Sequence, residues 1–188
     1  AEIDEQTLVM FTSDNGPWSM FEVHGGTAGP LRGEKGTSWE GGFRVPGIFR
    51  WPGTIAPATV SSLAANVDLY ATFASLTGGV QPSTAQGYVS KDLTSVLLSG
   101  KGAPRSKWLY AGGAVAFRSG KYKIHLTTKD RSSNPDTRQR EPVQHHEPPL
   151  LFDLDSDVSE KNNIASRHPE IVQRLQKELA EYRTTGGR

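Results

Sequence analysis

Two adjacent polar residues, Asp14 and Asn15, follow an apolar run and are the first candidates for chemistry. The run, TLVMFT at residues 7–12, predicts a strand buried on both faces, as in a parallel sheet. Ligands of open α/β sheets bind outside the carboxyl ends of such strands. A carboxylate beside a carboxamide offers the hard oxygen ligands that calcium or magnesium prefers. Asp-Asn-Gly is also a common turn, so a tight turn is the alternative interpretation.

A glycine-rich stretch at residues 24–42 is the second candidate region. Its backbone freedom suits a loop that wraps closely around a ligand or a metal, and a long surface loop is the alternative. His24 opens the stretch ahead of Gly25-Gly26, where its imidazole could line a pocket or cap a loop.

The remaining elements are those that must position these residues. Residues 45–51 predict an edge or irregular strand because they contain Pro46 and Gly47. Helices are expected after an N-cap at Asp68, over residues 93–98, and from Pro169 onward. Alternating apolar and polar residues predict an antiparallel hairpin with strands at residues 114–118 and 121–126. A third strand is expected at residues 150–154. The polar residues 129–149 before it predict a mobile loop.

Composition narrows the function classes. The chain has 188 residues, with 21 Lys and Arg against 20 Asp and Glu, so a generally basic nucleic-acid binder is not indicated. With no cysteine, a disulfide framework, a thiolate zinc site and a cysteine nucleophile are excluded. We find neither an apolar run long enough to span a bilayer nor the pattern of a signal peptide.

Long motifs give the chain a strong family resemblance. The segments TSDNGP and LRGEKGTSWEGGFRVPGIFRWPG, followed by NVDLYATFASLTG and GKYKIHLTT, resemble the sulfatase family (arylsulfatase type, alkaline phosphatase superfamily). HEPPLLFDLDSDVSEKNNIA resembles the C-terminal segment of lysosomal-type arylsulfatases. The resemblance covers nearly the whole chain.

The resemblance implies roles for individual residues. Asp14 and Asn15 match two ligands of the family's calcium ion, which holds the sulfate ester oxygens. Lys35 matches the lysine that binds the sulfate and lies near the leaving oxygen, where an ammonium stabilises developing charge. His24 is a further candidate for substrate binding. His145 and His146 are candidates near the substrate entrance.

Other side chains in these motifs have structural interpretations. We expect His125, Trp39 and Trp51 to be structural, and Arg44 to pair with Glu40.

The sequence departs from the family at the nucleophile. Sulfatases use a formylglycine made from Cys or Ser in a C/S-x-P-x-R motif, and this chain contains no such motif. The resemblance therefore implies the C-terminal portion of a sulfatase, whose formylglycine and other calcium ligands belong to an N-terminal part. The strand at residues 7–12 supports this, because no βα units in the chain bury it; without partners it would be exposed or self-paired. We expect no turnover by the chain alone.

The expected fold is an α/β (α+β) fragment in three parts: residues 1–58, the end of the catalytic sheet with its active-site loop; residues 59–105, connecting helices; and residues 106–188, a small antiparallel sheet with a packed C-terminal helix. Expected partners are a sulfate ester and the N-terminal part of the enzyme, without nucleic acid or a membrane span. The family implies a periplasmic, lysosomal or secreted location.

Two alternative functions stay open. A phosphate or phosphonate ester hydrolase of the same superfamily is one, although such enzymes tend to carry Asp-His where this chain has Asp14 and Asn15. The other is a non-catalytic module that binds sulfated polysaccharide through residues 101–140, which hold ten Lys and Arg against two Asp. A solvated hairpin face is the simpler interpretation of that charge.

Overall fold

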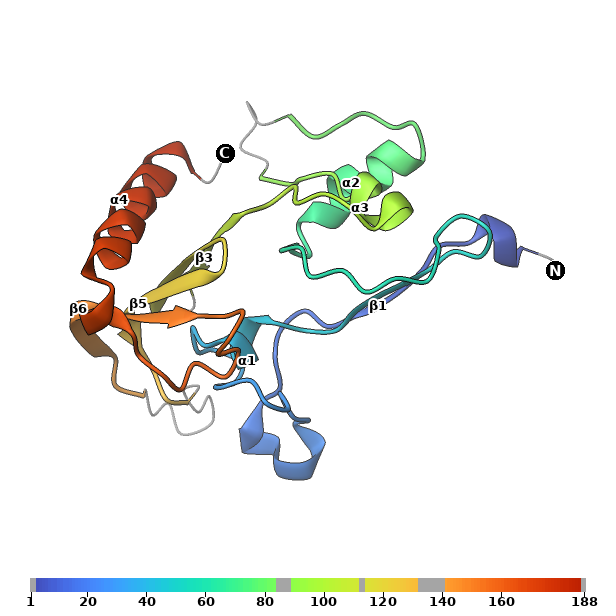
Figure 1. Ribbon diagram of the computed structural model, residues 1–188. Coiled ribbons are helices and arrows are strands. Elements are labelled where there is room, and N and C mark those ends of the chain that lie inside the picture. The colour runs from blue at the N-terminus through green and yellow to red at the C-terminus, as the bar shows by residue number, and fades with distance from the viewer. Residues whose placement is uncertain (1–2, 84–88, 112–113, 132–140, 187–188) are drawn as a thin grey trace. The chain divides into compact units, whose positions relative to one another are not determined.

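The computed structural model describes residues 3–83, 89–111, 114–131 and 141–186, which form a mixed α/β protein with two antiparallel sheets and a C-terminal helix (Figure 1). The chain divides into two compact units. The first comprises Ala1–Thr12, Pro46–Ser106 and Thr184–Arg188, and the second comprises Ser13–Val45 and Lys107–Arg183. The predicted domain limits at residues 58 and 105 stay a prediction. Among the described residues no helix has the length and apolarity to cross a membrane.

The first unit contains a two-stranded ribbon. Strand β1 (Val9–Thr12) follows the short helix η1 (Asp4–Gln6) and pairs antiparallel with β2 (Gly47–Arg50). The strand is therefore where the apolar run predicts it, but it is not buried on both faces. Phe11 is 63% exposed and Ile48 58% exposed, as expected for a strand without its sheet partners.

The first unit contains two helices and a buried ion pair at the start of the first of them. Helices α2 (Asp68–Leu76) and α3 (Thr94–Ser99) form where the sequence predicts them, and Gly100 ends α3 in the left-handed conformation. The predicted N-cap role of Asp68 is wrong, because Asp68 is the first helical residue and Val67 is the cap. The Asp68 carboxylate is instead fully buried, paired with the Arg105 guanidinium, and accepts the Ala65 and Lys91 amides at 2.8 Å each.

The second unit is built on a four-stranded antiparallel sheet in the order β3-β4-β5-β6. Its strands are β3 (Lys107–Ala111), β4 (Val115–Ser119), β5 (Tyr122–Thr128) and β6 (Gln144–Asp153). Strands β4 and β5 form the predicted hairpin, which is confirmed. The strand predicted at residues 150–154 is the end of the longer β6, and β3 is an additional strand that the sequence analysis does not predict. Strand β6 occupies part of the region predicted as a loop at 129–149, which is wrong for residues 144–149. Residues 132–140 of that region lie outside the described residues.

One face of this sheet is apolar and packs against the C-terminal helix. Helix α4 (Pro169–Thr185) follows the short helix η4 (Ala165–Arg167) and begins at the predicted proline. The register of the strands places one apolar side chain from each strand in a single row: Leu109, Phe117, Ile124 and Leu151. This row packs against the buried apolar residues of α4, which are Val172, Leu175 and Leu179. The helix predicted from Pro169 onward is confirmed.

The opposite face of the sheet is covered by residues from the glycine-rich stretch. Because side chains alternate along a strand, the neighbours of the apolar row point to this other face. Here Trp39, buried to 1% exposure, packs with Phe152 and Leu154. Two short helices flank the stretch: η2 (Ser19–His24) precedes it and α1 (Glu40–Phe43) lies at its end.

The buried ion pair of the first unit gives a stability prediction. Asp68→Asn removes the charge that compensates the buried Arg105 guanidinium, and breaking such a pair costs about 3 kcal/mol. We expect a clearly lower urea midpoint, followed by circular dichroism. Asp4→Asn, which breaks the exposed Asp4–Arg50 pair at 2.7 Å, is the matched control and should change the midpoint little. Equal effects of the two substitutions would contradict this role of Asp68.

Candidate functional site

Backbone contacts between glycines bring the two candidate segments together. The amide of Gly16 donates to the carbonyl of Gly42 at 3.0 Å, and the amide of Lys35 donates to the carbonyl of Pro17 at 2.8 Å. A Cβ on Gly16 would lie 1.8 Å from the carbonyl oxygen of Gly41, so no side chain fits there. The segment with Asp14 and Asn15 is therefore fixed against the segment with Lys35. The backbone at Gly16 is thus in close contact with the backbone at Gly41 and Gly42, at the end of the glycine-rich stretch.

Asp14 and Asn15 have side-chain oxygens available for a ligand. Asp14 is exposed and Asn15 is half-buried, and neither side chain has a hydrogen-bond or ion-pair partner within the described residues. The carbonyl of Asn15 accepts the Ser13 hydroxyl at 2.9 Å, which stabilises the turn. Two oxygen ligands are fewer than the six to eight that calcium takes. In the part of the chain that the structure describes, no group of three or more His, Asp or Glu residues could hold a metal.

Lys35 is half-buried, and its ammonium has an aromatic neighbour. Its Nζ lies 4.9 Å from the centroid of the Trp18 ring, and no described carboxylate pairs with it. A cation held against an aromatic face keeps its charge available to an anion. Gly33 and Gly36, on either side of the Glu34-Lys35 pair, both have positive φ angles, near 80°, which favour glycine.

His24 is exposed at the end of η2, and its imidazole has no partner among the described residues. Its backbone neighbour Gly25 accepts the Trp18 amide at 3.1 Å, so His24 lies close in the chain to the contact that closes this loop. His146 lies in β6, where its Nε2 contacts the Thr128 hydroxyl at 2.8 Å, and His145 is exposed beside it. Burial, followed by the charge of His145, lowers the pKa of His146. A role for these histidines at a substrate entrance stays a prediction.

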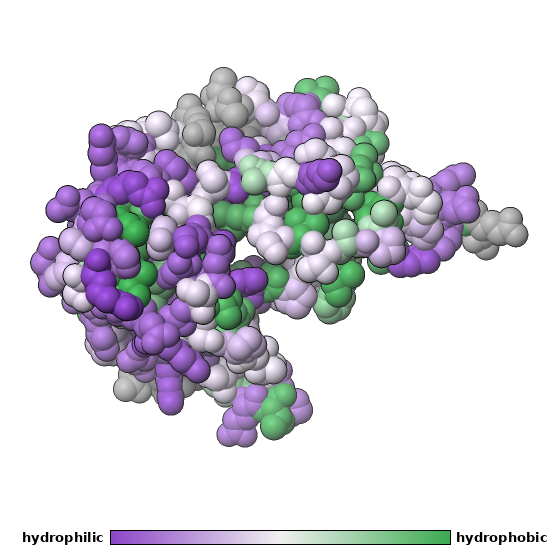
Figure 2. All heavy atoms as spheres, in the orientation of Figure 1, coloured by the Kyte–Doolittle hydropathy of each residue, from purple (hydrophilic) through white to green (hydrophobic). Residues whose placement is uncertain are grey.

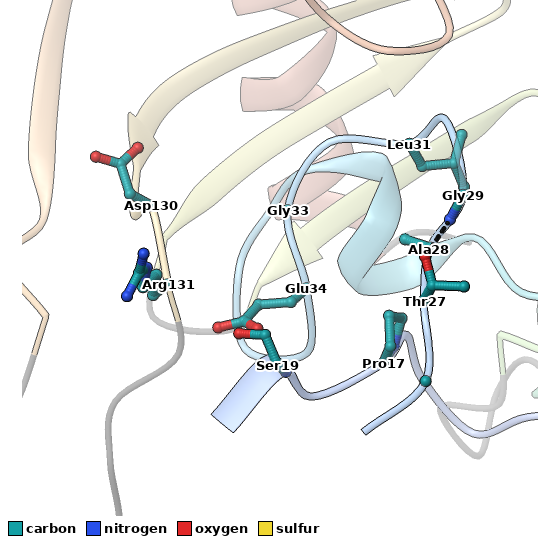
Figure 3. A pocket seen from close by; sticks show the side chains of 11 residues that line it. Pro17, Ser19, Thr27, Ala28, Gly29, Leu31, Gly33, Glu34, Asp130 and Arg131 are labelled. Carbon is teal, nitrogen blue, oxygen red and sulfur yellow. Dashed lines mark hydrogen bonds between the residues drawn. The ribbon is translucent and has the colours of Figure 1, made fainter. Parts of the chain in front are cut away.

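A pocket of about 340 Å³ is lined by residues of this loop together with Asp130 and Arg131 (Figure 3). Its polar lining includes Ser19, Glu34 and Arg131, and none of the predicted site residues lines it. Sequence reasoning missed Glu34, whose carboxylate is 7% exposed and accepts the Ser19 amide at 2.8 Å. Glu34 therefore fixes the start of η2 beside Lys35.

A buried cluster of charges holds the Lys35 loop on the sheet, and sequence reasoning missed it. Arg118 and Lys123 are cross-strand neighbours on the polar face, so their like charges need compensation. The Glu40 carboxylate supplies it, at 2.9 Å from Lys123 Nζ and 3.8 Å from Arg118. The same carboxylate accepts the Tyr110 hydroxyl at 2.9 Å. Burial and the charge of Glu40 raise the pKa of Tyr110 well above its usual value.

Glu160 completes this cluster from a backbone position of positive φ, 51°. Its carboxylate accepts the Glu40 amide at 2.7 Å and lies 3.1 Å from Lys123 Nζ. Burial raises the pKa of Glu160, but the hydrogen bond from His125 and the charge of Lys123 outweigh burial and lower it. We name Glu40, Lys123, His125 and Glu160 the buried charge cluster.

His125 is neutral in this cluster. Burial, which outweighs the hydrogen bond to Glu160, lowers its pKa to about 4, and the charge of Lys123 adds to this effect. Its Nε2–H donates to Glu160 at 2.7 Å, which leaves Nδ1 to accept the Ser38 hydroxyl at 3.2 Å. The structural role predicted for His125 is confirmed, as is the packing role of Trp39. Arg44 approaches Glu40 at 4.0 Å, as predicted, but Lys123 is the closer partner of that carboxylate.

Five of the eight basic residues that the structure describes in the segment 101–140 are paired with a carboxylate. Arg105, Lys107, Arg118, Lys121 and Lys123 each have a carboxylate partner, and Lys123 is fully buried. Lys121 and Lys123 therefore do not form a joint surface for a sulfated polymer. Because Lys123 is buried, a substitution there would affect the stability of the core and not a binding surface. Binding of such a polymer elsewhere on the chain stays a prediction.

Comparisons with known proteins agree across the chain. The family model "Sulfatase" matches residues 1–80, and the model "C-terminal region of aryl-sulfatase" matches residues 104–185. Arylsulfatase A of Bos taurus is 41% identical over 89% of this chain, and arylsulfatase A of Homo sapiens is 40% identical over 91%. The chain spans only 35% and 36% of the lengths of those relatives. The crystal structure of PsFucS1 sulfatase from Pseudoalteromonas sp. superposes with a TM-score of 0.83 at 28% identity, covering 96% of this chain and 37% of that one.

The close approach at Gly16 gives the first prediction for this site. Gly16→Ala forces the Asp14 segment away from Gly41, and such overpacking costs about 1–3 kcal/mol. We expect a lower urea midpoint together with changed NMR shifts at Asn15 and Lys35. Gly47→Ala is the matched control, because nothing lies within 4 Å of the added Cβ. An alanine at residue 16 that behaves like the control would contradict the close approach.

The neutral His125 gives a pH prediction. The unfolded chain takes up a proton at this histidine below about pH 6.5, whereas the folded chain does so only near pH 4. The free energy of unfolding should therefore fall by up to about 3 kcal/mol as the pH is lowered through this window. His125→Gln should flatten that dependence in urea titrations, whereas His168→Gln, at an exposed histidine, should keep it. A wild-type slope in His125→Gln would refute the assignment.

Proposed function

Because the chain belongs to the sulfatase family, we propose that it is the C-terminal part of a sulfatase that hydrolyses sulfate esters. The observation that carries this proposal is that two backbone segments fixed against each other carry three polar side chains, none of which has a hydrogen-bond or ion-pair partner among the described residues. A carboxylate, a carboxamide and an ammonium lie on two segments joined by the Gly16–Gly42 and Lys35–Pro17 hydrogen bonds. Oxygen ligands for a cation beside a positive charge for an anion suit a sulfate group bound to calcium.

Asp14 and Asn15 would hold the calcium ion. Their side chains fit this role because they offer hard oxygens without competing partners in the described ranges. Two oxygens do not complete a calcium site, so the remaining ligands would come from residues outside this chain. Bound calcium would supply charge that draws the sulfate oxygens into the site.

Lys35 would bind the sulfate and act near the leaving oxygen. Its ammonium can donate to a sulfate oxygen and stabilise the negative charge that develops as the ester bond breaks. The backbone around it is fixed through Glu34 and Pro17, so little reorganisation is needed during the reaction. His24 is a candidate to contact the rest of the substrate.

The nucleophile of this proposal, a formylglycine, would lie on an N-terminal part of the enzyme, since this chain contains no C/S-x-P-x-R motif. Following the family, we place the enzyme in a periplasm, a lysosome or the cell exterior. The natural ester is an open part of the proposal.

A direct test combines native mass spectrometry with an aryl-sulfate assay on the same sample. We expect the 188-residue chain alone to give no turnover of 4-nitrophenyl sulfate, and turnover to require a polypeptide that carries a formylglycine. The same sample should hydrolyse 4-nitrophenyl phosphate far more slowly. Turnover by the lone chain, or a preference for phosphate, would refute the proposal.

Substitution of Lys35 tests its assigned role in the active assembly. Lys35→Gln removes the charge facing the leaving oxygen, so kcat should fall roughly 100-fold or more. Lys161→Gln, at an exposed lysine, is the control and should leave kcat unchanged. Asp14→Ala should weaken calcium binding in calorimetry of the same assembly. Wild-type kcat in Lys35→Gln would exclude this lysine from the site.

A further inference from the structure

Lys35 lies at the tip of a tight turn. The Thr37 amide donates to the Glu34 carbonyl at 3.0 Å, and Gly36 has a φ angle of 82°. Glycine with a positive φ at the third position is typical of a type II turn, which places Lys35 at the second position. The buried Thr37 hydroxyl donates to the same carbonyl at 2.7 Å. The turn therefore has a fixed shape, and the place of Lys35 depends on what holds the two sides of the turn.

Both sides of this turn contact Glu160, which is distant in the sequence. On one side, Arg32 Nη1 donates to the Glu160 backbone carbonyl at 3.2 Å. On the other side, the Glu40 amide donates to the Glu160 carboxylate at 2.7 Å. The two sides also close on each other, because the Gly41 amide donates to the Arg32 carbonyl at 2.7 Å. Glu160 therefore fastens the turn before and after Lys35.

The Glu160 side chain is itself held from the sheet. Its second carboxylate oxygen accepts His125 Nε2–H at 2.7 Å, and Nδ1 of the same ring accepts the Ser38 hydroxyl at 3.2 Å. The His125 ring also packs against the Trp39 ring, with centroids 4.2 Å apart. His125 is fully buried in β5. A continuous set of contacts therefore runs from β5 through Glu160 to the residues that follow Lys35.

The reach of the Glu160 carboxylate matters separately from its charge. Lys123 Nζ lies 3.1 Å from Glu160 and 2.9 Å from Glu40, so two carboxylates share the compensation of that ammonium. The contacts with the turn, in contrast, depend on where Glu160 itself lies. Its backbone has a φ angle of 51°, a conformation that a glutamate keeps only where the surrounding structure imposes it. The fold therefore fixes this carboxylate at one place and one length from the backbone.

We propose that Glu160 is a positioning residue for the reaction, which sets the place of Lys35 by fastening both sides of its turn. The inference rests on the proposed function, because Lys35 must act on the sulfate ester for its place to affect the rate. Glu160 acts through Lys35 and does not touch the ester. A misplacement of about 1 Å at a reacting group can cost roughly 100-fold in rate. The C-terminal sheet thereby contributes to the chemistry as well as to the stability of the chain.

Two substitutions of Glu160 separate reach from charge. Glu160→Asp keeps the charge, and aspartate tolerates a positive φ better than glutamate, but its carboxylate is one methylene shorter. Glu160→Gln keeps the reach and removes the charge. Its carbonyl can still accept the Glu40 amide and its NH2 can donate to His125, whose neutral ring then takes the other tautomer. Positioning predicts the larger effect on Lys35 in Glu160→Asp, whereas charge compensation alone predicts the larger effect in Glu160→Gln.

The first measurement is hydrogen exchange by NMR on the 188-residue chain. The Lys35 amide donates to the Pro17 carbonyl at 2.8 Å, so its exchange reports on the place of the turn. The exchange rate of Lys35 relative to that of Leu175 in α4 should rise roughly ten-fold in Glu160→Asp and change less than about two-fold in Glu160→Gln. Arg32→Met removes the contact on the other side at an exposed residue, and should raise the same ratio even where Glu160→Asp does not fold. A wild-type ratio in Arg32→Met and in folded Glu160→Asp overturns the proposal.

Two control variants match these substitutions. Arg44→Met removes an exposed guanidinium that approaches Glu40 at 4.0 Å, and should leave the exchange ratio unchanged. Val172→Ala opens a cavity beneath α4, whose outer surface is mostly hydrophilic (Figure 2) and whose apolar residues pack on the face of the sheet opposite to the turn. It should lower the urea midpoint without raising the exchange ratio. An exchange ratio that rises equally in Val172→Ala reports general loss of stability and overturns the proposal.

The second measurement is a double-mutant cycle on kcat with 4-nitrophenyl sulfate, in the active assembly of this chain with a polypeptide that carries a formylglycine. Glu160→Asp should lower kcat roughly ten-fold, and should lower it no further in the Lys35→Gln background, because Glu160 acts through Lys35. An equal loss of kcat in both backgrounds assigns Glu160 a merely structural role and overturns the proposal while the proposed function stands. Wild-type kcat in Lys35→Gln refutes the proposed function itself, whatever the exchange ratio.

Discussion

Two like charges on neighbouring strands impose the constraint on which the second unit depends. Arg118 and Lys123 face each other across the sheet on the side opposite α4, and Lys123 is fully buried. A buried ammonium is tolerated only when carboxylates surround it and their remaining lone pairs are satisfied. Glu40 and Glu160 meet this need, and each comes from a segment outside the sheet. The charges of Arg118 and Lys123 are therefore compensated only when the segments that carry Glu40 and Glu160 pack on the sheet.

Docking through charge also sets the geometry of the candidate site. Glu40 is the first residue of α1, and Arg32, earlier in the same loop, donates to the Glu160 carbonyl at 3.2 Å and lies over the Trp39 ring. The loop that carries Lys35 is thus held at both ends by Glu160. Buried polar networks of this kind favour one arrangement, because any shift leaves a charge unpaired. Such uniqueness is what a site for a tetrahedral anion requires.

The sequence predicts the elements better than their environment. Hairpin, helices and the stripe of α4 follow from local periodicity, and the family resemblance selects Asp14, Asn15 and Lys35 without any geometry. Lys123 shows where such reasoning stops. In the sequence it belongs to a basic segment, and only the pairing of β4 with β5 and the approach of Glu40 show it to be buried. Strand β1 likewise has the composition of a buried strand, but burial depends on partners that its own residues do not encode.

The β1–β2 ribbon gives the site loop a simple topology. Residues 13–46 leave the ribbon after Thr12 and return at Gly47, and these two residues face each other in the ladder. Antiparallel partners lie about 5 Å apart, so the ladder itself holds the ends of the loop. The entropy cost of closing a loop grows only with the logarithm of its length. Insertions between Gly16 and η2 would therefore leave the loop ends in place, so the length of this loop can change while the ribbon stays the same.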